Sequence, residues 1–242
     1  IANLEPLVSY FYDNYSYLST IPNAVAMPAD STYPAGLDNG MGMLTGKAVW
    51  EDWYQILTTY RYDDRKRIVL EYENNLDGVY SIHTFSKYNF AGDLTGKKTV
   101  YNNTDLGFTY TSEYAYSYNN WGALTRVQHK MNNGAWTTLR TYSYDEVARK
   151  SSETVFPGGN SSNSKRTNYG YNLRGWTTSL SSPVFQQSLY YNTTLSGGIP
   201  QFDGSLSAMT FLSINSSGTP ENFSVTYGYD DFDRLASVNS IT

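Results

Sequence analysis

The stretch that decides the fold runs Thr141-Tyr142-Ser143-Tyr144-Asp145-Glu146-Val147-Ala148-Arg149, in which Tyr-x-Tyr is followed by an acidic residue and a short turn. Side chains at i and i+2 of an extended strand share a face, so Tyr142 and Tyr144 project together. Asp145 ends the strand, because its carboxylate can accept hydrogen bonds from the backbone N–H groups of the turn that it starts. The stretch therefore predicts a β-hairpin corner.

The same pattern recurs along the chain as a repeat unit. The second tyrosines of successive copies stand at 62, 88, 118, 144 and 171, separated by 26, 30, 26 and 27 residues, and the next stands at 229 after a gap of 58. That gap is two periods, and residues 201–206 lie where a shortened, hidden copy is expected. A similar double gap separates Tyr12, in the first copy, from Tyr62. A fixed period of this length indicates an array of supersecondary units, each unable to bury its apolar face alone.

The repeat residues are the tyrosine pair, the Asp or Asn that follows it, and an Arg or Gly in the turn. They are Tyr60, Tyr62, Asp63 and Arg67; Tyr116, Tyr118, Asn119 and Gly122; Tyr142, Tyr144, Asp145 and Arg149; Tyr169, Tyr171, Asn172 and Gly175; Tyr227, Tyr229, Asp230 and Arg234. We expect the tyrosines, which recur at the structural period, to contact their counterparts in the next hairpin.

Two corner designs occur among the copies. Copies with Asn carry Gly three residues later, which allows a positive φ at no steric cost. From Tyr60 onward, copies with Asp carry Arg four residues later. We expect an ion pair across these corners to offset the less favourable backbone at Lys66, Ala148 and Asp233, which would make the two designs interchangeable.

Composition excludes several classes of function. A net charge of −5 and a pI near 5.0 argue against nucleic-acid binding, because phosphates need a basic surface. No cysteine is present, so the fold does not depend on disulfides. No apolar run is long enough to span a membrane. The start at Ile1, within the pattern, leads us to expect that the chain is a piece of a longer protein.

We predict an all-β protein: an array of antiparallel β-hairpins in a long, twisted, curved sheet, either open or partly closed into a barrel or shell. Residues 1–56 are predicted to form an irregular N-terminal segment with one degenerate repeat, and residues 57–242 one continuous hairpin array. Within the first segment, residues 44–57 fit either a strand or a helical turn, and a strand is favoured because the next copy follows at once.

The pattern resembles the signature of bacterial YD-repeat (Rhs-type) proteins, Tyr-x-Tyr-Asp-x-x-Gly-Arg-Leu, which residues 60–68, 142–149 and 227–235 match well. The resemblance covers most of residues 57–242 and, more loosely, the first twenty. It implies hairpins joined edge to edge in a twisted sheet that spirals into a shell, outside the cell or on the surface of a bacterium. In some members the shell encloses a C-terminal toxin domain. The core segment that ends the repeats and a toxin domain are both missing from these residues, so encapsulation and self-cleavage are not carried over.

Catalytic chemistry has little support, and we expect neither an enzyme nor a cofactor or metal site. His83 and His129 stand in strand-like runs without metal-ligand or triad spacing. The acid pairs are adjacent in sequence, which in strands sends them to opposite faces, whereas a glycosidase needs two carboxyls about 5–10 Å apart at one bond.

We expect a structural scaffold or shell segment of an exported bacterial protein, with the neighbouring repeats as partners. The alternative is a carbohydrate- or cell-surface-binding module that uses Trp121 and Trp176, which stand in turns. An enzyme is the third reading.

Overall fold

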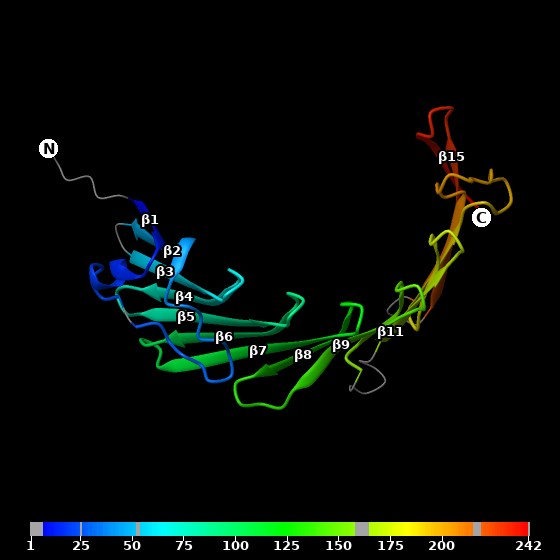
Figure 1. Ribbon diagram of the computed structural model, residues 1–242. Helices are drawn as coiled ribbons and strands as arrows, with labels where there is room; N and C mark the ends of the chain where they lie inside the picture. Colours follow the sequence, from blue (N-terminus) through cyan, green and yellow to red (C-terminus); the bar gives the residue numbers. More distant parts are fainter. Residues whose placement is uncertain (1–6, 25, 52–53, 158–164, 215–218, 242) are drawn as a thin grey trace. The chain divides into compact units, whose positions relative to one another are not determined.

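The structure is a computed structural model that describes residues 7–24, 26–51, 54–157, 165–214 and 219–241. It is an all-β protein in which sixteen antiparallel strands stand in the sheet in sequence order (Figure 1). Among the described residues, β1 and β16 are the two ends of the order, so the sheet is not closed into a barrel. The prediction of an array of antiparallel hairpins is confirmed.

The chain divides into two compact units, residues 1–137 and 138–242. The first contains β1 (Val8–Asp13), the 3-10 helix η1 (Ser16–Ser19), β2 (Gly40–Glu51), β3 (Tyr54–Tyr62), β4 (Ile68–Asn75), β5 (Tyr80–Tyr88), β6 (Leu94–Asn103), β7 (Phe108–Tyr118) and β8 (Leu124–Met131). The second contains β9 (Thr137–Tyr144), β10 (Lys150–Val155), β11 (Lys165–Tyr171), β12 (Thr177–Ser182), β13 (Phe185–Tyr190), β14 (Ala208–Ile214), β15 (Pro220–Tyr229) and β16 (Leu235–Ser240). The boundary predicted after residue 56 stays a prediction.

Each repeat copy forms one hairpin, and its Tyr-x-Tyr pair ends the first strand. The strand pairing shifts register immediately before the second tyrosine in seven hairpins, at Tyr12, Tyr62, Tyr88, Tyr118, Tyr144, Tyr171 and Tyr229. Such an irregularity re-aims the side chain that follows it. The second tyrosine therefore leaves the regular alternation of its strand at the point where the corner begins.

Residues 44–57 form strand on both sides of the β2–β3 connection, as predicted, and residues 52 and 53 lie outside the described part of the chain. The double gap between Tyr12 and Tyr62 holds no additional hairpin among the described residues, because β1 pairs directly with β2 and β2 with β3. A long insertion, residues 14–39, takes up the extra length. The expectation of a second period here was wrong, because length alone cannot distinguish a repeat from an enlarged corner.

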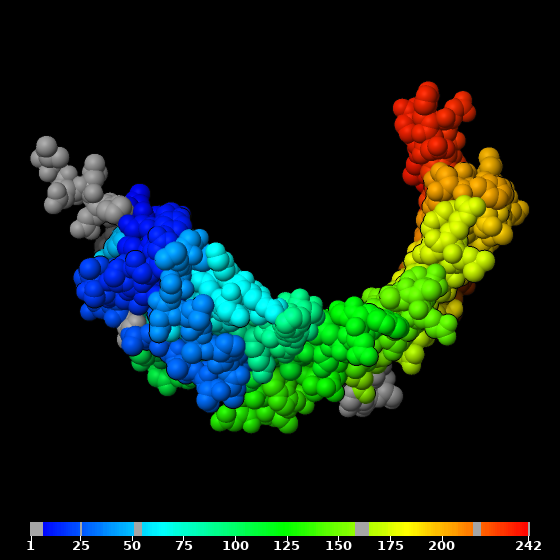
Figure 2. Space-filling model, in the orientation of Figure 1, coloured from blue at the N-terminus to red at the C-terminus, as the bar shows by residue number. Residues whose placement is uncertain are grey.

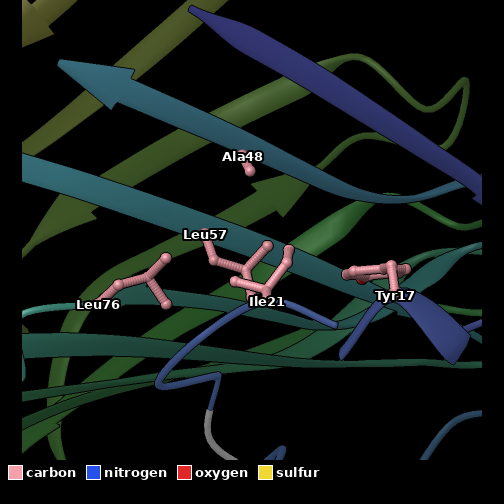
Figure 3. Packing of buried hydrophobic residues seen from close by; sticks show 5 residues of the cluster. All are labelled: Tyr17, Ile21, Ala48, Leu57 and Leu76. Carbon is pink, nitrogen blue, oxygen red and sulfur yellow. The ribbon is translucent and has the colours of Figure 1, made fainter. Parts of the chain in front are cut away.

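The insertion lies against the strands that follow it, as the blue segment in Figure 2 shows. Tyr17 and Ile21 come from its first part and pack with Ala48 and Leu57 of the sheet and with Leu76 of the turn after β4 (Figure 3). Burying such a side chain contributes about 1.5–3 kcal/mol. The insertion thus supplies the apolar cover that a single-layer sheet lacks.

A second cluster forms around Tyr33, which is buried against Leu70, Tyr72 and Phe85. The hydroxyl of Tyr33 donates to Oε1 of Glu113 at 3.1 Å. Polar contacts elsewhere in the insertion fix it to the same face: Lys98 pairs with Asp30 at 2.6 Å, and Arg61 with Asp38 at 2.8 Å. The insertion is therefore a strap, which we define as residues 14–39, pinned by charge across β3, β6 and β7.

The Asp30 ion pair makes the stability of the strap depend on pH. Burial of the carboxyl acts to raise its pKa, but hydrogen bonds from Lys98 and Thr32 outweigh burial and lower the pKa from 3.8 to about 2. Because the folded pKa lies below the unfolded one, the charged carboxylate stabilises the fold above pH 3.8, and this stabilisation is lost as the pH falls through about 2.

We predict that Asp30→Asn makes the free energy of unfolding less dependent on pH between about 4 and 2, as measured by urea unfolding at each pH. Asp105→Asn, in an exposed turn, is the matched control and should follow the unmodified chain. Equal pH slopes for Asp30→Asn and the unmodified chain would contradict the assignment.

Candidate functional site

The hairpin corners use the Asp or Asn side chain in one way. Oδ1 of Asp63 accepts hydrogen bonds from the backbone N–H groups of Arg65 and Arg67, both at 2.9 Å. The same oxygen accepts two backbone N–H groups at the corners that begin with Asn89, Asn119, Asp145, Asn172 and Asp230. The side chain thereby satisfies donors that have no ladder partner within the turn.

The fourth residue of each corner has a positive φ, as the sequence predicts. Glycine holds this place at Gly92 (104°), Gly122 (78°) and Gly175 (84°), and other residues hold it at Lys66 (63°), Ala148 (64°) and Asp233 (57°). Non-glycine residues adopt this region uncommonly, so the Asp corners carry a backbone cost that the Asn–Gly corners avoid.

The ion pairs expected across the Asp corners are present. They are Arg67–Asp63 at 2.6 Å, Arg149–Asp145 at 2.7 Å and Arg234–Asp230 at 2.7 Å. At Asp230, hydrogen bonds from the side chain and then from the backbone of Arg234 lower the pKa of the carboxyl. The carboxylate is therefore charged at neutral pH and holds the arginine in a fixed orientation.

The second tyrosine reaches back to the preceding hairpin. The hydroxyl of Tyr118 donates to the carbonyl oxygen of Leu94 at 2.8 Å, and Leu94 is the first strand residue after the preceding corner. The same bond joins Tyr62 to Leu44 (2.6 Å), Tyr88 to Ile68 (3.1 Å), Tyr171 to Lys150 (2.9 Å), Tyr191 to Thr177 (2.8 Å) and Tyr229 to Leu206 (3.0 Å). We refer to this hydrogen bond as the tyrosine latch.

The latch has a fixed place in the strand register. Between β6 and β7 the first aligned pair is Gly96 with Ala115; the acceptor Leu94 lies two residues before Gly96, and Tyr118 lies three residues after Ala115. The same offsets hold at Thr59, Phe85, Asn168, Ser188 and Thr226, each of which lies three residues before a latching tyrosine. The latch therefore extends the pairing between two hairpins beyond the end of their ladder.

The latching hydroxyls are hydrogen-bond donors at neutral pH, because the ordinary pKa of tyrosine is about 10. Burial raises the pKa of Tyr62 and of Tyr118 further. A hydrogen bond of this kind contributes about 0.5–1.5 kcal/mol net, and an acceptor left without its donor costs about 1–3 kcal/mol. The second tyrosines thus contact the backbone of the preceding hairpin, whereas the sequence led us to expect contact with their counterparts in the next hairpin.

The hidden copy at residues 201–206 is present, in a form that the sequence shows only in part. Leu206 accepts the hydroxyl of Tyr229 just as Leu94 accepts that of Tyr118, which confirms the corner. The tyrosine of this hairpin is Tyr191, ten residues before Gln201, whose backbone N–H donates to the carbonyl oxygen of Tyr191. Sequence reasoning missed Tyr191, although the Tyr-Asn step at residues 191–192 was an available signal.

Arginines of two Asp corners reach forward to the following hairpin. The guanidinium of Arg67 lies 4.6 Å from the ring centre of Tyr88 and donates to the carbonyl oxygen of Asn89 at 3.2 Å. Arg149 repeats this arrangement, 4.8 Å from the ring of Tyr171 and 3.1 Å from the carbonyl oxygen of Asn172. We refer to this double contact as the arginine clamp.

The clamp is a contact that the expected interchangeability of the two corner designs does not include, and that interchangeability stays a prediction. A glycine in the turn relieves the local backbone but makes no contact with the next hairpin. Arg67 and Arg149 expose 24% and 33% of their side chains, whereas Arg234, at the last corner, exposes 73%. Two of the three arginines therefore have a second role, between hairpins, that the sequence pattern does not reveal.

The first tyrosines of the copies are all partly buried: Tyr60, Tyr116, Tyr142, Tyr169 and Tyr227. The Lys150 ammonium lies 4.5 Å from the ring centre of Tyr169 and 5.9 Å from that of Tyr142. The ring of Tyr116 stacks on that of Tyr114 at 6.3 Å. These tyrosines contribute packing within the sheet surface.

The two candidate binding tryptophans have different surroundings. Trp121 exposes 64% of its surface at the tip of the Asn119 corner. Trp176 is partly buried: its ring centre lies 5.0 Å from that of Tyr191 and 5.1 Å from the Arg174 guanidinium. An open hollow of about 260 Å³ beside Trp176 is lined also by Asn172, Leu173 and Asn192. Only Trp121 offers a largely uncovered ring.

The titratable side chains do not gather into one site. His83 is bonded to the hydroxyl of Ser81 at 3.1 Å, and burial lowers its pKa, while His129 is bonded to that of Ser112 at 2.9 Å. In the part of the chain that the structure describes, no three His, Cys, Asp or Glu side chains are grouped to hold a metal. No helix there is long and apolar enough to cross a membrane.

No protein-family profile and no curated protein match the chain. Two crystal structures illustrate the similarity that this chain shows to solved structures. The crystal structure of TcdB2-TccC3-Cdc42 matches 84% of this chain at 11% identity with a TM-score of 0.29, and that of TcdB2-TccC3-TEV matches 79% at 12% identity with a TM-score of 0.25. This chain spans 15% and 14% of the length of those two chains.

We predict that Arg149→Ala destabilises the chain by about 1–2 kcal/mol, because it removes an ion pair, a hydrogen bond and a ring contact together. Adding Ala148→Gly should restore only the part due to the turn backbone, whereas full restoration would contradict the clamp. Arg234→Ala, which removes an exposed corner pair without a following hairpin, is the matched control and should cost less. Denaturant unfolding measures all three.

Proposed function

We propose that the chain is a non-catalytic structural segment, a scaffold built of hairpin repeats. The contacts that the repeat residues make give this role its strongest support. The second tyrosines bind the backbone of the preceding hairpin, and the corner Asp and Asn side chains bind the backbone of their own turns. The residues that recur most strictly therefore stabilise the hairpins and join them to one another.

The parent protein is proposed to be a larger exported bacterial protein of the YD-repeat (Rhs) type, located outside the cell or on its surface. The support is the Tyr-x-Tyr-Asp pattern in several copies at a constant period. In such a protein the neighbouring repeats of the same chain are the principal partners, and the segment serves as part of a scaffold or shell.

The absence of catalysis is part of the proposal, and the placement of the charged side chains is consistent with it. Glu153 is engaged by Lys150 at 3.1 Å and also by Arg140, and Glu113 by Lys130 at 2.8 Å. Carboxylates paired in this way hold strands together. They are poor general acids or bases, because such a group must be free of a counter-charge and have a pKa near the operating pH.

Binding of carbohydrates or of a cell surface is the second candidate function, and one observation favours it. The largely uncovered ring of Trp121 offers a flat apolar face of the kind on which sugars stack. Trp176 supports it less, since Arg174 and Tyr191 already lie against its ring, although the hollow beside it is open.

A glycan array probed with the intact chain distinguishes the two functions. The scaffold role predicts no saturable binding, and Trp121→Ala and Trp176→Ala should leave the array signal unchanged. Micromolar binding that is lost in Trp121→Ala and retained in Trp136→Ala, a matched exposed tryptophan away from the corners, would replace the scaffold proposal with the binding module.

A further inference from the structure

Arg61 of β3 contacts the strap at three separate places. Its guanidinium carbon lies 5.5 Å from the ring centre of Tyr15, and its Nη1 pairs with Oδ1 of Asp38 at 2.8 Å. Its Nε donates a hydrogen bond to Sδ of Met27 at 3.2 Å. These three partners come from the start, the middle and the end of the strap. The position of one guanidinium therefore affects the whole segment.

Arg61 has little freedom to move without the strap. Its side chain is 22% exposed. The backbone of Gly36 in the strap lies directly over it, so that a Cβ at Gly36 would stand 2.7 Å from Cβ of Arg61 and 3.0 Å from Cγ2 of Val69. A change that pushes the guanidinium away from one partner therefore disturbs its contacts with the others.

Met27 is the one of the three partners that carries an oxidisable thioether, and it is the only methionine between residues 14 and 39. Its side chain packs against the buried cluster around Tyr33. A hollow of about 60 Å³ beside it is lined also by Asp30, Arg61, Leu70 and Phe85. One water needs roughly 10–15 Å³ of such space, so a small polar molecule fits beside the sulfur.

We propose that Met27 is a redox-sensitive site, at which oxidation by hydrogen peroxide releases the strap from the sheet. The sulfur attacks one peroxide oxygen, and an S–O bond forms as the O–O bond breaks. The departing hydroxide takes the proton of the transferred oxygen and leaves as water. The thioether loses two electrons, the peroxide gains them, and the product is methionine sulfoxide.

The surroundings of Met27 explain why one added oxygen loosens the strap. Nε of Arg61 lies 3.2 Å from the sulfur, which leaves no room for an oxygen atom between them. To donate to the sulfoxide, the guanidinium must retreat and change its contacts with Tyr15 and Asp38. An oxygen turned toward the apolar cluster instead would be a polar atom without a donor, which is unfavourable.

The amide of Leu37 reports whether the strap is docked, because its N–H donates to the carbonyl oxygen of Tyr62 at 2.7 Å. We expect hydrogen exchange of this amide to become about tenfold faster when hydrogen peroxide has oxidised Met27 in the intact chain. Mass spectrometry of peptides locates the added oxygen. Treatment with methionine sulfoxide reductases should restore slow exchange.

Two variants assign the response to one sulfur. Met27→Leu, which is close to methionine in volume, should keep the strap docked and lose the response to peroxide. Met41→Leu is the matched control: Met41 is 72% exposed and hence more accessible to the oxidant, yet its replacement should leave the response unchanged.

The proposal would be overturned by a Met27 that stays unoxidised while Met41 is fully oxidised, or by oxidised Met27 with unchanged or slower exchange at Leu37. A response that persists in Met27→Leu, that is lost in Met41→Leu or that the reductases do not reverse would overturn it too. The scaffold role does not depend on this site, so an insensitive strap would leave the proposed function standing.

Discussion

The structure depends on how each hairpin is joined to the one before it. A single hairpin is marginally stable in water, and a repeat array gains its stability from contacts between neighbours. Here the ladder between successive hairpins ends before the corner, and the tyrosine latch continues it by donating to the next free carbonyl oxygen, as Tyr118 does to Leu94. This bond satisfies a backbone acceptor and fixes the ring across the junction at the same time.

Charge adds a second connection that runs in the opposite direction along the chain. The latch links a hairpin to its predecessor, whereas the clamps of Arg67 and Arg149 link a hairpin to its successor. The aspartate at the start of the corner has two roles: it accepts hydrogen bonds from the backbone of its own turn, and it orients the arginine. At two of the three Asp–Arg corners the turn arginine thus also connects hairpins, whereas the glycine of an Asn–Gly corner relieves the backbone locally.

The N-terminal unit has a further layer of stabilisation in the strap. Tyr17 and Tyr33 cover apolar residues on the sheet, and Asp30 and Asp38 pair with basic side chains from β6 and β3. The strap is thus an element of stability of the N-terminal unit.

The repeat pattern was sufficient to predict the all-β hairpin array, the positive φ at Ala148 and the Asp145–Arg149 ion pair, because all three are set within a few residues of sequence. Tyr191 was missed because an insertion separates it from its corner, and the strap because its contacts, such as Tyr33 with Glu113, join residues far apart in the sequence. The contacts of Arg67 and Arg149 with the following hairpin were missed for the same reason, because no local sequence pattern indicates which strand lies beside the corner.

The most direct test of the latch is native-state hydrogen exchange in Tyr118→Phe, which removes one hydroxyl and leaves the ring. The account predicts a loss of about 0.5–1.5 kcal/mol and faster exchange in β6 around Gly96, in the preceding hairpin, as well as at the Asn119 corner. Tyr116→Phe, whose hydroxyl makes no hydrogen bond within the described residues, should leave both unchanged. Faster exchange confined to β7 and β8, or equal effects of the two variants, would contradict the claim that the second tyrosine joins one hairpin to the next.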